Sequence, residues 1–371
     1  MRVGVDGRSL VGGGARGVAH YTSALLGALA AGFPADEWRV LLPRGPVGAL
    51  PPGLVPVHSA LPSRVLFGAA ALAGRPRLDR LLGADLDVLW TPAPAPVAVS
   101  AGVPVVVTVH DRSWEQRPDD FTVYERLWHR AARLRALVRG AERVVCVSQA
   151  VRQDLVAAWG LDPGRVCAIH SAPAVVGAVT RPRPGGGTAP PAAPAPRAAR
   201  PFFLFVGALE PRKAPDLLLE AFVRARAAGL KADLRIVGDG RLSGRLLAHG
   251  AYRHGRVGDA ELSGLYRDAL ALAFPSRLEG FGLPPVEALR AGTPVVASDL
   301  PVLREVLSDA GAMWVPPGDV AALAAALLRL EREPALRGRL VAAGRAATAE
   351  LSWTATARAT RAVLAEAAGL P

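Results

Sequence analysis

The sequence predicts an α/β protein in which two Rossmann-like domains with parallel sheets face each other across a cleft. Its 371 residues exceed what one ordinary hydrophobic core accommodates. Short runs rich in valine and leucine alternate with helical stretches along both halves, which favours parallel strands joined by helical crossovers. Residues 181–200, RPRPGGGTAPPAAPAPRAAR, have the composition of a linker. We therefore expect domains over 1–180 and 201–350, followed by a helix over 351–371.

The first half begins with a strand and a glycine-rich loop that leads into a helix. The run VPVVVTV at 103–109 is apolar throughout, as expected of a strand that is covered on both faces of its sheet. The other strand candidates share this character, and helical stretches separate several of them. We expect strands over 2–7, 38–43, 87–92, 103–109, 143–148 and 165–170, and helices over 18–31, 122–139 and 149–159.

The second half repeats the alternation after the linker. Because the carboxyl ends of parallel strands share one edge of a sheet, ligand contacts are expected in the loops that directly follow the strands. We expect strands over 201–207, 234–240, 271–276 and 294–299, and helices over 214–229, 261–268 and 284–291.

Charge and cysteine content argue against several classes of function. The formal net charge is +12, and arginines of the 181–200 linker contribute four of these charges. The sequence has no clustered basic face with stacking aromatic residues, which argues against a nucleic-acid partner. Cys146 and Cys167 lie in apolar runs and are expected to be buried rather than paired or metal-bound.

The chain is expected to be soluble and cytoplasmic. No apolar run reaches the roughly 18 residues of a membrane-spanning helix, and Asp6 and Arg8 interrupt the only early apolar stretch. Residues 63–82 mix apolar and arginine positions, which leaves peripheral contact with the inner face of a membrane open, although a buried helix and loop are favoured. The sequence predicts no particular oligomeric state.

Residues 276–299, SRLEGFGLPPVEALRAGTPVVASD, carry the strongest local signal. Gly280 and Gly282 allow the backbone to approach a ligand closely, and two prolines then open a predicted helix. The first N–H groups of a helix and its positive dipole end form an anion site. The amides near Gly282 and Leu283 are therefore expected to face a phosphate group.

Two glutamates, Glu279 and Glu287, lie on either side of this helix opening. Glu287 is expected in the first helical turn, where it could accept hydrogen bonds from a diol such as ribose, and Glu279 could reach sugar hydroxyls. Both carboxylates could instead only complement the helix dipole. Their spacing favours neither interpretation.

The stretch GFGLPPVEALRAGTPVVAS, with its glutamates, resembles the signature of the retaining glycosyltransferases of family four, which have the two-domain GT-B fold. The resemblance extends from residue 2 to about residue 365. It implies that Gly280, Phe281, Gly282 and Leu283 contribute to binding of a nucleotide-sugar donor.

The stretch FVGALEPRKAPDLLLEAF at 205–222 is similar to the diphosphate segment of that family. The resemblance implies that Gly207, Arg212 and Lys213 lie at the donor's phosphates. Adjacent arginine and lysine side chains could neutralise a diphosphate without a metal. An arginine–lysine pair by itself more often indicates a solvated surface.

The segments 234–241 and 254–276 are similar to the nucleobase side of the family's donor site. This implies that the backbone near Val257 meets the base. The Gly-Asp-Gly step at 238–240 by itself indicates only a structural turn.

In the first domain, the glycine-rich loop at 12–17 matches a dinucleotide fingerprint only loosely. The resemblance instead favours Gly17 as a glycine of close approach to the donor. His110 and Asp111 directly follow the strand at 103–109. A lone histidine is usually structural, but the resemblance implies that His110 supports catalysis beside the donor sugar.

No metal or cofactor is expected. The Asp-Leu-Asp step at 85–87 matches a metal-binding Asp-x-Asp formally, but it precedes a strand and indicates a solvated loop. Residues 170–173 depart from the Asn-Gly-Val-Asp that the family commonly has. The resemblance implies that the helix over 351–371 crosses back to the first domain, although a closing helix of the second domain is an alternative.

The resemblance implies transfer of a hexose, with mannose from GDP-mannose favoured, to an acceptor hydroxyl with retention at the anomeric carbon. The acceptor could be a glycan, a lipid-linked molecule or a small molecule. Alternatives on the same fold are a nucleotide-sugar epimerase and a sugar phosphorylase. A dinucleotide-dependent oxidoreductase and a catalytically silent sugar-binding protein are alternatives from other classes.

Overall fold

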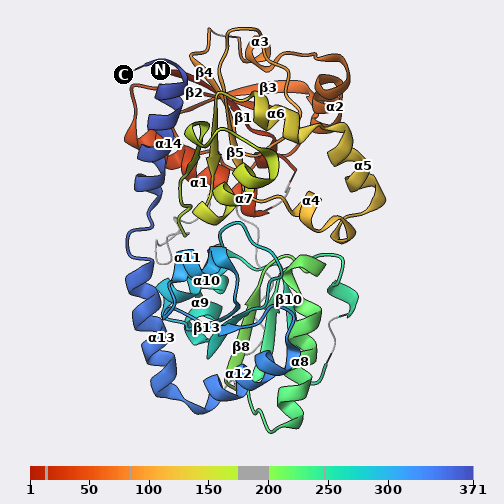
Figure 1. Ribbon diagram of the computed structural model, residues 1–371, viewed down its shortest axis with the longest axis vertical. Coiled ribbons are helices and arrows are strands. Elements are labelled where there is room, and N and C mark those ends of the chain that lie inside the picture. Colours follow the sequence, from red (N-terminus) through yellow and green to blue (C-terminus); the bar gives the residue numbers. More distant parts are fainter. Residues whose placement is uncertain (13–15, 84, 174–199, 246–247, 371) are drawn as a thin grey trace, which may run out of the picture. The chain divides into compact units, whose positions relative to one another are not determined.

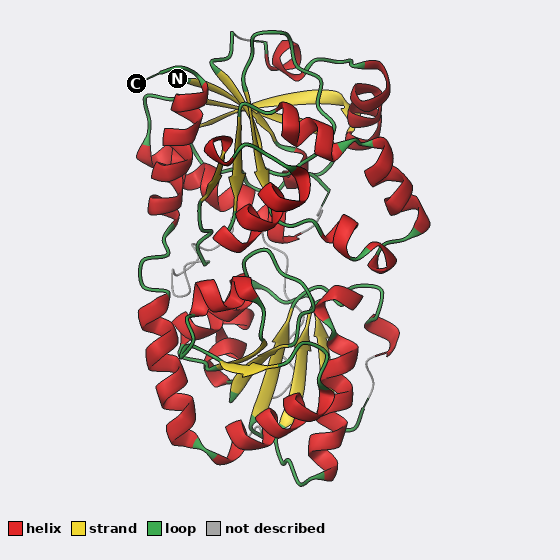
Figure 2. Cartoon of the chain, in the orientation of Figure 1, coloured by secondary structure: helices red, strands yellow, loops and turns green. Residues whose placement is uncertain are grey.

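Two parallel sheets, flanked on both faces by helices, organise the chain and confirm the predicted fold class (Figures 1 and 2). The computed structural model describes residues 1–12, 16–83, 85–173, 200–245 and 248–370. One unit comprises Met1–Ala172 with Glu350–Pro371, and the other comprises Pro173–Ala349. The linker predicted at 181–200 lies outside the described residues, except for Arg200.

The first unit is built on a seven-stranded sheet in the order β3-β2-β1-β4-β5-β6-β7. Every neighbouring pair in this sheet is parallel. Trp90 is fully buried on β4, and its indole Nε1 donates to Thr108 Oγ1 on β5 at 3.0 Å. The strands are β1 (Arg2–Asp6), β2 (Glu37–Arg44), β3 (Leu54–Pro62), β4 (Val88–Thr91), β5 (Val105–Val109), β6 (Arg143–Cys146) and β7 (Val166–Ala168).

The helices of the first unit have recognisable end signals. In α7, the Ser148 hydroxyl accepts from the Val151 amide at the start, and Gly160 ends the helix in the left-handed region. Arg133 has φ 49° and divides the helix predicted over 122–139 into α5 and α6, although no glycine or proline marks the break. The helices are α1 (Arg16–Gly32), α2 (Ser63–Ala73), α3 (Leu78–Leu82), α4 (Ser113–Gln116), α5 (Val123–Ala131), α6 (Leu134–Gly140), α7 (Gln149–Trp159) and α14 (Trp353–Ala367).

The second unit is built on a six-stranded parallel sheet in the order β10-β9-β8-β11-β12-β13. No helix in the described parts of the chain is both long and apolar enough to cross a membrane. The strands are β8 (Phe202–Val206), β9 (Asp233–Val237), β10 (Ala251–Gly255), β11 (Ala271–Phe274), β12 (Val295–Ser298) and β13 (Met313–Val315). The helices are α8 (Pro215–Ala227), α9 (Asp259–Asp268), α10 (Leu283–Ala291), α11 (Pro301–Leu307), α12 (Val320–Arg332) and α13 (Pro334–Ala347).

Three strands that the sequence did not predict, β3, β10 and β13, all lie at sheet edges. Most side chains of β3 and β10 are exposed or half-buried, and β13 has only three residues. An edge strand has a neighbour on one side only and is less covered than a central strand, so it lacks a continuous apolar run.

The last helix, α14, packs on α1 and on strands of the first unit. The Thr356 hydroxyl donates to the His170 carbonyl at 2.8 Å. On the next turns of the same helix, Arg361 Nε lies 2.8 Å from Asp36 Oδ2, in the loop between α1 and β2. Only 4% of the Asp36 side chain is exposed, so this ion pair is a mostly dry attachment of α14.

We expect Asp36→Ala to lower the free energy of unfolding by about 2 kcal/mol at pH 7, because it leaves Arg361 without its partner. Burial raises the pKa of Asp36, but hydrogen bonds and charges from Arg361 and the Met1 amino group outweigh burial and hold that pKa below its usual value. The carboxylate therefore stabilises the fold above its unfolded-state pKa of about 3.9 and loses this effect as the pH falls through the lower folded-state value.

Denaturant unfolding of wild type and variant at several pH values measures this difference. The difference in free energy of unfolding between wild type and Asp36→Ala should be largest near pH 7 and should decrease below about pH 4. The exposed Asp85 offers a matched control, because Asp85→Ala removes a carboxylate for which no partner side chain is found in the described residues. A difference in free energy of unfolding that did not change with pH would contradict the proposed stabilisation by the ionised Asp36 carboxylate.

Candidate functional site

The second sheet reverses its strand order at β8, which pairs with β9 on one side and with β11 on the other. In open parallel sheets, ligands bind outside the carboxyl ends of the strands at such a reversal. The loops that follow β8 and β11 are therefore the natural place for a site. They contain the predicted site residues Gly207, Arg212 and Lys213 on one loop and residues 279–283 on the other.

The loop after β8 is held in a defined conformation. Residues Pro211–Lys213 form one turn of 3₁₀ helix, and the buried Ala214 adopts φ 50° before Pro215 opens α8. A non-glycine residue in this region of φ is strained and persists only where its surroundings enforce it. The enforcement includes Arg277, whose amide donates to the Arg212 carbonyl at 2.8 Å and whose Nη1 donates to the Pro211 carbonyl at 2.9 Å. One backbone–backbone bond and one bond from the Arg277 side chain thus join the two loops.

An ion pair joins the same two loops: Lys213 Nζ donates to Glu279 Oε1. The Lys213 side chain is 13% exposed and that of Glu279 is 6% exposed. Lys213 Nζ also lies 5.4 Å from the centre of the Phe274 ring on β11. A charge this little hydrated interacts strongly with any further charge that reaches it. The two residues for which the sequence predicted separate roles therefore form one electrostatic unit.

Helix α10 opens beside this pair. Gly282 is its N-cap with φ 95°, and a Cβ added there would lie 2.5 Å from Leu303 Cδ2, so only glycine fits without strain. Leu283 is the first helical residue, and the two prolines that follow it have no N–H group. Among the described residues, the amides of Gly282 and Leu283 donate to no protein acceptor. They remain available to an anion.

Glu287 differs from its predicted position. Because α10 begins at Leu283, Glu287 lies past the first turn, which contains no acidic residue. Its Oε2 accepts a hydrogen bond from the phenol of the buried Tyr266, on α9, at 2.9 Å. Burial and the neighbouring Glu287 raise the pKa of Tyr266 well above its usual value, so Tyr266 stays a hydrogen-bond donor. Glu287 is therefore held by α9 and does not cap the helix.

The structure assigns Gly238 a role that the sequence analysis limited to a turn. Gly238 follows β9 with φ 140°, and a Cβ added to it would lie 1.8 Å from the carbonyl oxygen of Gly207. A Cβ on Gly240 would lie 2.7 Å from the Leu209 carbonyl oxygen. Because both residues lack a Cβ, the loop after β9 can pack directly against the backbone of the loop after β8. Two glycines directly after a strand were the available signal for this contact.

Among the described residues, Val257 has no hydrogen bond or ion pair with the loops that follow β8 and β11. It is half-buried between β10 and α9, and β10 is an edge strand that is separated from β8 by β9. Its predicted contact with a nucleobase stays a prediction.

In the first unit, His110 follows β5 and is half-buried. Its Nε2 lies 2.8 Å from the Pro92 carbonyl oxygen, and its ring meets the Tyr21 ring edge-on at 4.8 Å. Burial lowers the pKa of His110, against opposing effects of Pro92 and Asp111, so the ring is neutral near pH 7. Because a carbonyl only accepts, Nε2 carries the hydrogen, and Nδ1 of the neutral ring is an acceptor.

Gly17 lies in the first turn of α1, and a Cβ added there would meet no atom within 4 Å. Packing within the protein therefore does not require glycine at this position. The predicted approach of a ligand to Gly17 stays a prediction.

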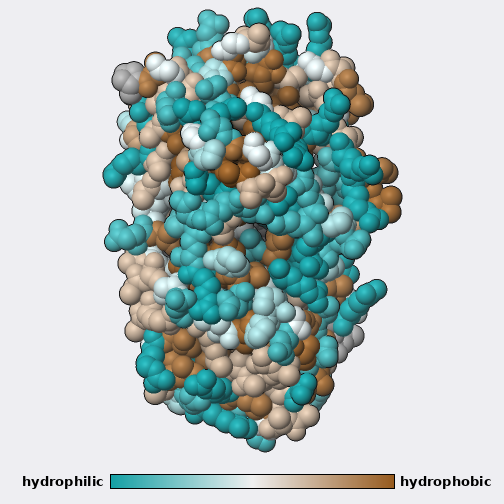
Figure 3. Space-filling view, in the orientation of Figure 1, coloured by the Kyte–Doolittle hydropathy of each residue, from teal (hydrophilic) through white to brown (hydrophobic). Residues whose placement is uncertain are grey.

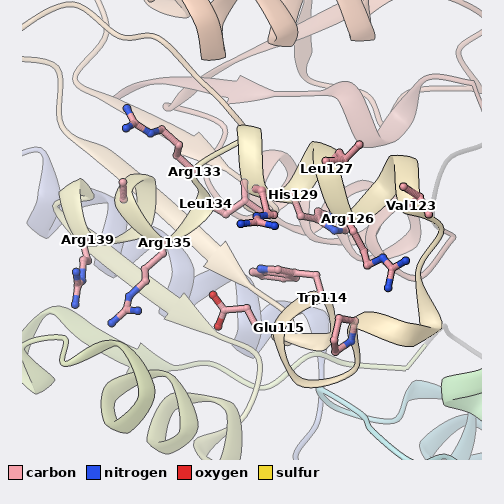
Figure 4. Close-up of a pocket in the computed structure, with 13 residues that line it drawn as sticks. Trp114, Glu115, Val123, Arg126, Leu127, His129, Arg133, Leu134, Arg135 and Arg139 are labelled. Carbon is pink, nitrogen blue, oxygen red and sulfur yellow. The ribbon is translucent and has the colours of Figure 1, made fainter.

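A pocket in the first unit was not expected from the sequence. It is lined by residues of α4, α5 and α6, among them five arginines and one acid, Glu115. Figure 4 shows the Trp114 ring between His129 and Glu115, with the ring centres of Trp114 and His129 5.8 Å apart. The arginines are Arg126, Arg130, Arg133, Arg135 and Arg139.

Within the described residues, no group of three or more His, Cys, Asp or Glu side chains could hold a metal ion. Asp87, from the Asp-Leu-Asp step, accepts a hydrogen bond from the backbone amide of Arg2 at 2.6 Å. This carboxylate therefore accepts a hydrogen bond from the first residue of β1.

Models of two protein families match the chain. The family described as "Glycosyltransferase Family 4" matches residues 15–172, and the one described as "Glycosyl transferases group 1" matches residues 191–347. The chain is 33% identical over 354 residues to a phosphatidyl-myo-inositol mannosyltransferase of Mycobacterium leprae, which covers 87% of this chain and 86% of that protein. It is 34% identical over 254 residues to a D-inositol 3-phosphate glycosyltransferase of Kineococcus radiotolerans, which covers 60% of this chain and 57% of that protein.

Among solved structures, HepE of Anabaena in complex with UDP and glucose has a similar fold. The TM-score is 0.69 at 16% sequence identity, with 99% of this chain and all of that chain covered.

We expect Gly238→Ala to destabilise the second unit by about 3 kcal/mol or more, because the new methyl group overlaps the Gly207 carbonyl oxygen. Gly244→Ala is a matched control, since Gly244 is exposed and a Cβ there meets nothing within 4 Å. Thermal unfolding followed by calorimetry measures both changes. Equal midpoints for the two variants would refute the close contact between the loops.

Proposed function

Because the chain belongs to family four of the glycosyltransferases, we propose that it moves a hexose from a nucleotide sugar to an acceptor hydroxyl with retention at the anomeric carbon. The observation that carries this proposal is the Lys213–Glu279 ion pair beside the opening of α10. It combines a little-hydrated cation, a carboxylate and free backbone amides at the strand reversal. These are the groups that a sugar diphosphate requires.

The diphosphate is the leaving group in this proposal. Arg212 is half-buried, and its side chain has no hydrogen-bond or ion-pair partner among the described residues. Arg212, Lys213 and the amides of Gly282 and Leu283 would stabilise the negative charge that builds up on the diphosphate as the glycosidic bond breaks. Donors fixed in advance at a developing charge each contribute about 3–4 kcal/mol to such a barrier.

Glu279 would change partner when the donor binds. The diphosphate carries more negative charge than one carboxylate and attracts Lys213, which leaves Glu279 able to accept hydrogen bonds from sugar hydroxyls. The acceptor oxygen then bonds to the anomeric carbon on the face that the diphosphate leaves. The acceptor proton passes to the departing phosphate oxygen, so the step needs no protein base.

We favour GDP-mannose as the donor, since the M. leprae relative is named a mannosyltransferase. UDP-glucose is the main competitor, because the HepE structure holds UDP and glucose. Acceptors to test first are phosphatidylinositol and D-inositol 3-phosphate, for which the two relatives are named.

We expect Lys213→Ala and Glu279→Ala each to lower kcat/KM for mannosyl transfer about 10²-fold or more, because each removes charge at the reacting diphosphate or sugar. Asp85→Ala should retain full activity. The measurement is release of GDP together with formation of the mannosylated acceptor, with UDP-glucose in a parallel assay.

Other outcomes of this assay distinguish the alternatives. Donor conversion without an acceptor would indicate an epimerase, and dependence on inorganic phosphate would indicate a phosphorylase. Donor binding without any turnover would indicate a sugar-binding protein. Unchanged mannosyl transfer in both Lys213→Ala and Glu279→Ala would contradict the proposed role of the ion pair.

We further propose that His110 accepts a hydrogen bond from a hydroxyl of the donor sugar through Nδ1. Protonation of the ring removes this acceptor, so kcat/KM should fall about tenfold per pH unit once the pH drops below the lowered pKa of His110. His110→Gln retains an amide donor and an acceptor but does not titrate, so its acid limb should be flat over the same range. The pH profiles of both proteins check this. An acid limb that persists in His110→Gln would assign the titration to another group.

A further inference from the structure

Two neighbouring helices of the first unit, α2 and α5, present large apolar side chains to solvent. On α2, Val65 is 50% and Leu72 is 86% exposed. On α5, Val123, Tyr124 and Leu127 are each at least 60% exposed. These five residues, here called the α2–α5 patch, include half of the large apolar side chains that are exposed in the described residues.

The two helices form one surface. The Arg64 guanidinium of α2 lies 5.8 Å from the centre of the Tyr124 ring of α5. Figure 1 shows α2 and α5 next to each other, and Figure 3 shows apolar atoms gathered at the rim of the first unit where α5 lies. The helix α2 was expected to be buried, but only Leu66, Phe67 and Ala70 are buried. Its opposite side has no partner in the described chain that covers it.

Positive charge is concentrated around the patch. Residues 61–82 and 117–139 contain ten arginines and four acidic residues, an excess that is half of the chain's net charge of +12. The remaining residues of 1–172 contain nine arginines and ten acidic residues. The positive charge of residues 1–172 is therefore confined to the two segments that carry the apolar side chains.

Several arginines are placed to act together with the apolar side chains. Arg126 and Arg130 lie one turn apart on α5 and line the same pocket as Val123 and Leu127. The pairing of Arg126 is weak, because its nearest acid, Asp119, is 96% exposed and 3.6 Å away.

We propose that the α2–α5 patch docks on an anionic phospholipid surface. The apolar side chains would enter the headgroup region, and the surrounding arginines would pair with lipid phosphates. Anionic bilayers bind exposed apolar faces that are bordered by basic residues, because the apolar side chains enter the headgroup region and the basic side chains pair with lipid phosphates. Long arginine side chains can keep their charge at the headgroup level while their stems stay in apolar contact.

The charge distribution argues against two other occupants. A second copy of the chain would bring an equal excess of positive charge against the patch, which repels. A single-stranded nucleic acid would require several stacking aromatic side chains, and the patch offers only Tyr124. The inference goes beyond the proposed transferase activity and does not depend on it, because docking needs no donor.

The test is co-sedimentation of the full chain with vesicles of phosphatidylcholine alone and of phosphatidylcholine mixed with phosphatidylglycerol. We expect binding to the mixed vesicles only, and weaker binding as NaCl is raised. Leu72→Ser with Leu127→Ser, and separately Arg126→Glu with Arg130→Glu, should each reduce the partition coefficient about tenfold or more. All four positions lie on the surface, so both variants should keep the wild-type thermal midpoint.

Matched controls come from exposed positions outside the patch. Val223→Ser on α8 and Arg358→Glu on α14 change the same chemistry and should bind like wild type. Equal binding to neutral vesicles, or equal loss in patch and control variants, would overturn the proposal. Patch-dependent self-association or RNA binding without vesicle binding would also overturn it, in favour of those partners.

Discussion

The ion pair between Lys213 and Glu279 depends on one constraint of the fold, the pairing of β8 with β11. Because these strands are neighbours and parallel, the loops that follow them meet at the same edge of the sheet. Two backbone carbonyls of the first loop accept from Arg277 of the second. The loops are therefore fixed before any ligand arrives, and a site fixed in advance does not lose binding energy to reorganisation.

The pair also explains how the well-packed loops at the carboxyl ends of β8 and β11 can accommodate the charge of Lys213 when no ligand is bound. A lysine with 13% exposure would be costly if it were left without a counter-charge. Glu279 supplies that charge in the ligand-free protein. In the mechanism that we propose, a diphosphate replaces the carboxylate as the partner of Lys213, and Glu279 becomes a hydrogen-bond acceptor for the sugar of the donor. One contact thus links stability of the loops with the chemistry expected of a family-four glycosyltransferase.

The sequence predicted the strands at the centres of both sheets and the edge strand β7, but it missed the other three edge strands, β3, β10 and β13. Central strands are covered on both faces and carry continuous apolar runs, whereas β3 and β10 expose most of their residues. Helices α11, α12 and α13 were not predicted, and the helix predicted over 122–139 is divided at Arg133. Glu287 was expected in the first turn of α10 but lies one residue past it, because the helix begins at Leu283, directly after the left-handed Gly282. The sequence indicated only a turn at Gly238. The carbonyl oxygen that requires glycine there belongs to Gly207, which is distant in the sequence, so local sequence could not reveal the contact.

The sequence by itself determined the local features of this protein: alternating strands and helices, glycine-rich loops after strands, and a proline-marked helix opening near residue 284. These follow from backbone preferences of neighbouring residues. Only the tertiary structure decided that Lys213 and Glu279, 66 residues apart, form a pair. It also decided that one side of α2 and α5 stays uncovered. Spacing reveals an apolar face, but whether another element covers that face depends on segments far along the chain.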